Sequence, residues 1–143
     1  MKLSTGKVAF PIEFDNGDKQ NIYFNPSDPD LSIRMRDFEK RMNERTAELD
    51  DIKLNAEGNP EDVTLIDKME NIRNILCEEL DIAFGNKISD VVFKHCSPFA
   101  IVDGEYFILQ FISAVKPEIE KHVKKANADA EKKLNKHIAK YKK

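Results

Sequence analysis

The segment KVAFPIEFDNGDKQNIYF, residues 7–24, decides the N-terminal part of the fold. Its first half places Val8, Phe10, Ile12 and Phe14 at every second position, which is the period of a half-buried strand. Its last four residues alternate in the same way, and an Asp-Asn-Gly-Asp turn separates the two halves. The sequence therefore predicts a β-hairpin over residues 7–24.

The turn of this hairpin allows two registers. A two-residue turn would pair Phe10 with Tyr23 and split the apolar side chains between the two faces. A three-residue loop over residues 15–17, with Gly17 in the left-handed conformation, pairs Phe10 with Ile22 and keeps those side chains together. Because a one-residue slip moves every side chain to the other face, burial favours the three-residue loop.

Two long helices of similar length are expected after the hairpin, over residues 28–54 and 61–84. Asp28 is a suitable N-cap for the first helix, and Pro29 suits its first turn. Gly85 supplies the C-terminal stop of the second helix. Because a short polar loop joins the two apolar stripes, the sequence predicts an antiparallel αα-hairpin.

The C-terminal part predicts a short helix over residues 88–94 and a long helix over residues 104–141 that is Lys-rich after residue 120. Pro117 is expected to kink the long helix, since proline costs about 3 kcal/mol in a helix interior. The predicted fold class is α+β and mainly helical. It comprises an N-terminal β-hairpin, an αα-hairpin and a long Pro-kinked C-terminal helix in a single domain, residues 1–143.

The composition excludes several classes of protein. Charged residues make up 34% and hydrophobic residues 41%, which fits neither a membrane protein nor a disordered tail. The longest apolar stretch, residues 106–115, is half the length of the roughly 20 residues that a membrane helix needs. Cys77 and Cys96 are too few for a disulfide framework, so we expect two reduced thiols in a cytosolic protein.

The net charge of −3 hides a strong asymmetry along the chain. Residues 121–143 contain nine Lys against two acidic residues, a formal charge of +7, so the other 120 residues carry −10. A basic end of this kind can bind an acidic partner, or it can be the solvated face of a helix. It contains no Arg and one aromatic residue, Tyr141, so nucleic-acid binding would rest on weak phosphate attraction.

The sequence contains none of the common enzyme signatures. It lacks a Gly-rich phosphate loop, a Gly-x-Ser-x-Gly elbow and a His-Glu-x-x-His pair. His95-Cys96 and Cys77 lack the paired spacing of a zinc site, and the turn at residues 15–18 lacks a twelve-residue calcium loop. We therefore expect no enzymatic activity, no cofactor and no metal site.

The candidate partner-binding residues lie in the C-terminal part of the chain. A thin apolar stripe continues at helical spacing beyond Pro117 among many lysines, which suits reversible binding of a helical client or of a second copy of the chain. The candidate contact residues of this segment, residues 119–141, are Ile119, Val123, Leu134 and Ile138 with Lys124, Lys125, Lys132 and Lys133. We expect residues 8–115 to fold without this segment.

The apolar run at residues 106–112 has two interpretations. It can be a central helix that is buried on most sides, or part of it can contact a partner. In the second case the contact residues would be Phe107, Leu109 and Phe111.

The arrangement resembles a known family. The hairpin runs into Phe24-Asn25-Pro26-Ser27-Asp28-Pro29, the second long helix closes on Ile82-Ala83-Phe84-Gly85, and the chain ends in a Lys-rich helix. From about residue 8 to residue 136 this resembles the small tail assembly chaperones of long-tailed bacteriophages, of the Siphoviridae and prophage-like type, in Gram-positive hosts.

The resemblance implies a non-enzymatic role. Such chaperones are mostly helical, coat the tape-measure protein and help to recruit tail-tube subunits around it. They are made in the cytoplasm of the infected bacterium, are generally absent from the finished virion and often have a longer, frameshifted form. The resemblance carries over no catalytic residue, and the residues that match, Phe24, Pro26, Asp28, Phe84 and Gly85, are expected to be structural.

Two other functions remain open from the sequence. The chain can be a structural tail or baseplate protein that stays in the virion, or a basic-tailed nucleic-acid adaptor. The presence of the protein in purified virions, and its binding to duplex DNA at low salt, distinguish these functions from a chaperone.

Overall fold

The N-terminal hairpin consists of β1 (Val8–Glu13) and β2 (Lys19–Phe24), which pair antiparallel. The computed structural model describes residues 1–50 and 63–141. Phe10 pairs with Ile22, and Gly17 has a φ of +88°, so the predicted three-residue loop is confirmed. The loop closes where the Phe14 N–H donates to the Asp18 carbonyl at 2.9 Å.

One face of this hairpin is part of the core. Phe10, Ile22 and Phe24 are buried, whereas Tyr23, which points to the other face, is 48% exposed. The Phe10 and Phe24 rings stack with centroids 4.2 Å apart, and the Phe24 ring meets the edge of Phe84 at 4.9 Å. Burial of these rings fixes the register because a slipped strand would turn them toward solvent.

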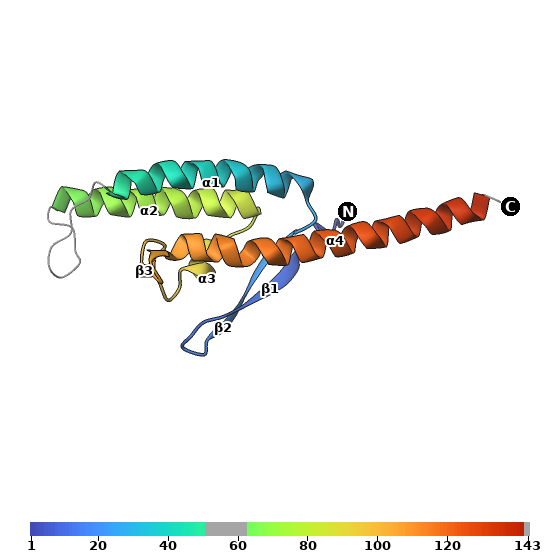
Figure 1. Ribbon diagram of the computed structural model, residues 1–143, viewed down its shortest axis with the longest axis horizontal. Coiled ribbons are helices and arrows are strands. Elements are labelled where there is room, and N and C mark those ends of the chain that lie inside the picture. The colour runs from blue at the N-terminus through green and yellow to red at the C-terminus, as the bar shows by residue number, and fades with distance from the viewer. Residues whose placement is uncertain (51–62, 142–143) are drawn as a thin grey trace.

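The two long helices, α1 (Pro29–Asp50) and α2 (Val63–Phe84), lie side by side (Figure 1). The Asp28 carboxylate accepts a hydrogen bond from the Asp30 N–H at 3.0 Å, which confirms the predicted N-cap. The predicted end of the first helix at residue 54 and the predicted start of the second at residue 61 lie outside the described residues. Glu79 on α2 contacts Arg41 and Arg45 on α1 at 3.8 and 3.9 Å.

The end of α2 is a Schellman motif. Gly85 has a φ of +69°, and its N–H donates to the Ile82 carbonyl, while the Asn86 N–H donates to the Asp81 carbonyl. The predicted helix at residues 88–94 is a single turn, α3 (Ser89–Val92). The Asp81 carboxylate holds this turn by accepting hydrogen bonds from the Ile88 and Ser89 N–H groups and from the Ser89 hydroxyl, all within 2.9 Å.

The prediction of a helix from residue 104 was wrong at its start. Residues 101–106 form a small hairpin of β3 (Ile101–Val102) and β4 (Glu105–Tyr106), and α4 (Phe107–Tyr141) begins after it. Asp103 and Gly104 both have positive φ, 52° and 85°, as a two-residue hairpin turn requires. The Gln110 side-chain amide donates to the Val102 carbonyl at 2.6 Å and joins the small hairpin to α4.

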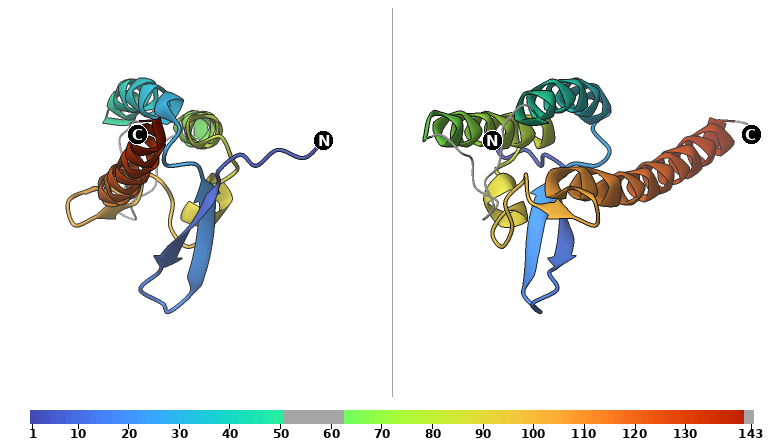
Figure 2. Two further views of the ribbon diagram at one scale, coloured as in Figure 1. Left: turned by 90° about the vertical axis from the view of Figure 1, so that its right-hand side faces the viewer. Right: turned by 60° about the vertical axis from the view of Figure 1, so that its left-hand side comes forward.

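Helix α4 continues through Pro117 as one helix, and its axis changes direction along its length (Figure 2). Proline cannot donate to the carbonyl four residues earlier, which belongs to Ser113. Both residues are exposed, so the missing hydrogen bond lies on the solvent side of α4. The proline is therefore tolerated without ending the helix.

The core lies where the hairpin, α1, α2, α3 and the first turns of α4 meet. Helix α4 contributes Ile108, Phe111, Ile112 and Val115 to it, each at most 8% exposed. The rest of α4 extends away from this body (Figure 1). The observed architecture is α+β and mainly helical, as predicted.

Candidate partner-binding surface

The protruding part of α4, residues 127–141, is here called the arm (Figure 1). Every side chain of residues 127–139 is exposed. Leu134 is 58% exposed and Ile138 is 40% exposed. The arm therefore presents two large apolar side chains to solvent on a helix that also exposes Lys132 and Lys133.

The segment just before the arm is attached to the body. Ile119 is partly buried against the core and faces Leu31 and Met35 of α1 across a shallow depression. Lys116 forms an ion pair with Glu39 of α1 at 2.5 Å. The His122 ring meets the edge of Phe10 on β1, with centroids 4.8 Å apart. These contacts fix the direction of α4 up to about residue 122.

The four predicted apolar contact residues thus fall into two groups, one against the body and one on the arm. Ile119 packs against the body and Val123 is half-buried, whereas Leu134 and Ile138 project from the arm. The four predicted lysines, Lys124, Lys125, Lys132 and Lys133, are all exposed.

The second predicted surface lies in the body. Phe111 is 8% exposed and its ring lies 5.9 Å from that of Phe84. Phe107 is half-buried beside Phe93, with ring centroids 6.1 Å apart. Leu109 is partly buried against the core. The first turns of α4 therefore have most of their apolar surface inside the molecule.

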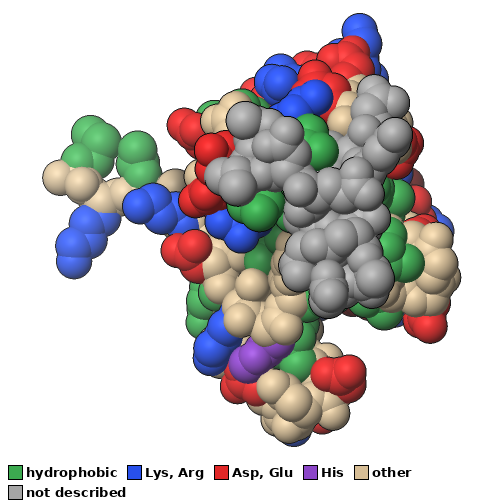
Figure 3. All heavy atoms as spheres, turned by 90° about the vertical axis from the view of Figure 1, so that its left-hand side faces the viewer, with side chains coloured by type: hydrophobic (Ala, Val, Ile, Leu, Met, Phe, Trp, Pro, Cys, Tyr) green, Lys and Arg blue, Asp and Glu red, His purple; other side chains and the backbone are tan. Residues whose placement is uncertain are grey.

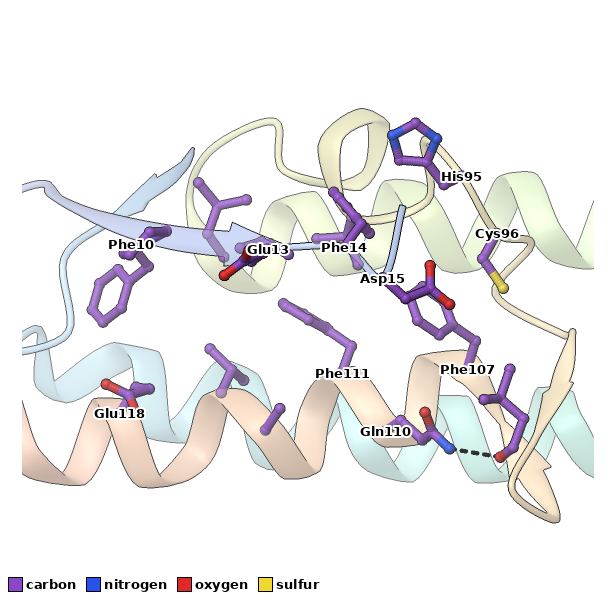
Figure 4. A pocket seen from close by; sticks show the side chains of 17 residues that line it. Phe10, Glu13, Phe14, Asp15, His95, Cys96, Phe107, Gln110, Phe111 and Glu118 are labelled. Atoms are coloured by element: carbon purple, nitrogen blue, oxygen red, sulfur yellow. Dashed lines mark hydrogen bonds between the residues drawn. The ribbon is translucent and has the colours of Figure 1, made fainter. Parts of the chain in front are cut away.

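A cavity of about 710 Å³, here called the groove, opens between β1, the loop after α3 and the first turns of α4 (Figure 4). Its apolar lining includes Phe10, Ile12 and Phe14 from β1 and Phe107, Phe111 and Val115 from α4. Glu13, Asp15 and Glu118 also line it, and Cys96 and His95 lie at one end. No pattern in the sequence predicts this groove, because its walls come from three distant segments.

A polar cluster joins the tip of the first hairpin to the loop after α3. His95 Nε2 lies 2.7 Å from the Asp18 carboxylate, and the Lys94 ammonium lies 3.2 Å from it. The hydrogen bond from His95, followed by those from Gln20 and Lys94, lowers the pKa of the Asp18 carboxyl to about 2. The cluster fixes one wall of the groove, and no sequence signal linked residues 77 positions apart.

Cys77 and Cys96 are free thiols and both are half-buried. Burial raises the pKa of each thiol, which lowers the thiolate fraction and makes it a poor nucleophile. Within residues 1–50 and 63–141, no group of three His, Cys, Asp or Glu side chains is arranged to hold a metal ion. Over the same part of the chain, no helix is long and apolar enough to cross a membrane.

On the face opposite the arm, the side chains around the residues drawn in grey are mixed in charge. Figure 3 shows acidic and basic side chains close together there, with hydrophobic side chains between them. The arm differs in combining apolar side chains with exposed lysines on a single projecting helix. This makes the arm the stronger candidate for contact with a partner.

No protein-family model, curated protein or solved structure matches this chain.

Proposed function

We propose that this protein is a non-enzymatic assembly chaperone that binds a long helical client through the arm. Following the resemblance in its sequence, the client is the tape-measure protein of a long-tailed bacteriophage, around which the chaperone helps to recruit tail-tube subunits. The protein then acts in the cytoplasm of the bacterial host during phage assembly.

The observation that carries this proposal is the exposure of every side chain of the arm from residue 127 to residue 139. A helix that buries no face against its own domain gains little stability from packing, so its apolar side chains are free to contact another molecule. Leu134 and Ile138 supply a modest apolar contact, and the surrounding lysines add attraction for acidic groups. A contact of this kind favours fast, reversible binding over a permanent interface.

A truncation tests the role of the arm. Deleting residues 127–143 should leave the helical signal of the body and its cooperative unfolding intact, because residues 127–139 are exposed and lie outside the buried core. Binding to a purified tape-measure fragment should be weaker and less sensitive to salt, since exposed charges are screened within about 10 Å at 0.1 M. If the truncated protein binds the fragment as tightly as the full chain, the client site lies elsewhere.

A matched pair of variants separates the arm from exposed apolar residues in general. Leu134→Ala with Ile138→Ala should weaken binding of the fragment. Ile33→Ala with Ile82→Ala removes side chains of similar exposure, 50% and 63%, from α1 and α2 and should leave binding unchanged. An equal loss of fragment binding in both pairs of variants would contradict a specific role of the arm.

Two further measurements distinguish the alternative functions. Mass spectrometry of purified virions should find none of this protein, whereas its presence in them would indicate a structural tail or baseplate protein. Binding to duplex DNA at low and high salt tests the third function. Tight binding at low salt that disappears on deletion of the arm would favour a nucleic-acid adaptor.

A further inference from the structure

The groove has the length of a short helical segment. Its lining residues on α4 run from Phe107 to Glu118 at positions that share one face of the helix. At 1.5 Å per residue this face extends over about 16 Å. The floor includes buried side chains of the core, and Ala114 on the wall is too small to fill the space above them. The groove therefore offers an apolar trough rather than a pocket for a compact ligand.

Three carboxylates line the groove, and they come from β1, from the turn after it and from α4. Glu118 lies at one end and Asp15 toward the other, with Glu13 between them (Figure 4). Neither Lys nor Arg lines the groove in the described part of the chain. Lys121 pairs with Glu118 at 3.5 Å, but no ion pair involves Glu13 or Asp15 among the described residues. The trough thus suits an apolar helix that carries positive charge.

The arm has the complementary chemistry. Its apolar side chains Ala130, Leu134 and Ile138 are four residues apart and extend over about 12 Å, which is shorter than the groove. Lys132, Lys133 and Lys136 flank them and are exposed. The arm has exposed apolar surface to cover, and the groove has carboxylates that lysines can neutralise.

The arm cannot enter the groove of its own chain. The same helix forms the groove wall up to Glu118 and continues through Pro117 without a break into the arm. Leu134 lies 16 residues beyond Glu118, which is about 24 Å along the helix. A continuous helix cannot fold back over that distance, so an arm in the groove has to come from another molecule.

We propose that the groove between β1 and α4 binds the arm of a second copy of this chain. The contact joins different surfaces of the two copies, so it is heterologous unless each arm enters the other's groove and closes a two-fold dimer. This goes beyond the proposed function because it assigns a role to a surface that client binding does not use. An arm seated in a groove is covered, so a client that needs the same arm competes with self-association.

Groove and arm variants of the full chain test this by complementation. Ala114→Arg places a bulky cation on the groove wall. Leu134→Asp with Ile138→Asp replaces the exposed apolar side chains of the arm by negative charges, which the carboxylates of the groove repel. Each protein alone should associate at least about tenfold more weakly than the parent in sedimentation velocity. Ala47→Arg makes the same change at an exposed site on α1 and should associate like the parent.

A mixture of the two defective proteins gives the decisive result. The first keeps an intact arm and the second an intact groove, so together they should form a complex that stops at one copy of each. If the mixture stays monomeric while the parent associates, the arm does not bind the groove. A parent that is monomeric up to roughly 1 mM would overturn the proposal as well.

Crosslinking provides a direct check of the contact. In a background with Cys77→Ser and Cys96→Ser, Ala114→Cys places an exposed thiol on the groove wall. Adding Leu134→Cys or Ile138→Cys should allow a short bifunctional thiol reagent to join two chains, whereas Ala47→Cys should not. Absence of crosslinks from both arm positions in a protein that self-associates would contradict the proposal.

The two proposals fail in different ways. If the groove does not bind the arm, Ala114→Arg changes neither self-association nor client binding. If the arm has no client, the tape-measure fragment either fails to bind the parent or binds it equally well after residues 127–143 are deleted, while the complementation result is unaffected. An Ala114→Arg protein that loses self-association and keeps its client supports both.

Discussion

Replacing Phe24 by Ala should remove a large part of the stability of this protein. Phe24 is fully buried, with its ring 4.2 Å from Phe10 and 4.9 Å from Phe84. Truncation of a buried Phe to Ala costs about 3–5 kcal/mol, and the whole domain is expected to have about 5–15 kcal/mol. Phe24→Leu keeps most of the apolar volume and loses two ring pairs of about 0.5–1.5 kcal/mol each, so it should cost about 1–3 kcal/mol.

Equilibrium unfolding in urea, followed by far-UV circular dichroism, measures these losses as a shift of the midpoint at constant slope. Tyr23→Ala is the matched control on the same strand. Tyr23 lies on the opposite face of β2 and is 48% exposed, so its loss should cost less than about 1 kcal/mol.

The comparison tests the strand register. Similar losses of stability in Phe24→Ala and Tyr23→Ala would mean that neither face of β2 is preferentially buried. A larger loss at Tyr23 would indicate the two-residue turn, which places the opposite set of side chains in the core. Either result would refute the reasoning that burial selects the register.

Three other substitutions have defined outcomes. Gly17→Val should cost about 1 kcal/mol or more in urea unfolding, because Gly17 has a φ of +88°. A Cβ added at Gly17 would meet no other atom within 4 Å, so the cost is conformational. The lowered pKa of the Asp18 carboxyl stabilises the parent above pH 3.8, the pKa of the unfolded state, and this stability is lost as the pH falls toward 2. Asp18→Asn should remove this contribution, which unfolding curves of the parent and the variant across this pH range measure. Arg34→Met should cost about 1 kcal/mol, because the Arg34 guanidinium donates to the Ala83 carbonyl at 2.8 Å and ties α1 to the end of α2; a melting temperature equal to the parent's would contradict this.

Local patterns in the sequence were sufficient for several elements. The alternation in residues 8–14 and the position of Gly17 gave the hairpin and its register because both act between neighbouring residues. The cap at Asp28 and the stop at Gly85 are likewise formed within one turn of chain. Interactions that span a few residues are encoded by those residues and can be predicted from them.

The small hairpin at residues 101–106 was missed for a related reason. Its strands are two residues long, which is too short for alternation to be detected, although Asp103-Gly104 is a typical two-residue turn. The apolar character of the residues around it favoured an early helix start. Tertiary contact with α4, through Gln110, stabilises the hairpin instead.

The sequence by itself determined the order of the helices, the hairpin register and the basic, weakly apolar C-terminal stripe. It presented residues 119–138 as one continuous stripe, because helical spacing says nothing about where the rest of the domain ends. The tertiary structure alone decided that Ile119 packs against the core, that Leu134 and Ile138 project into solvent, and that Glu13 and Glu118 line one groove. The physical reason is that burial and the meeting of distant side chains depend on how elements pack, which periodicity within one element does not contain.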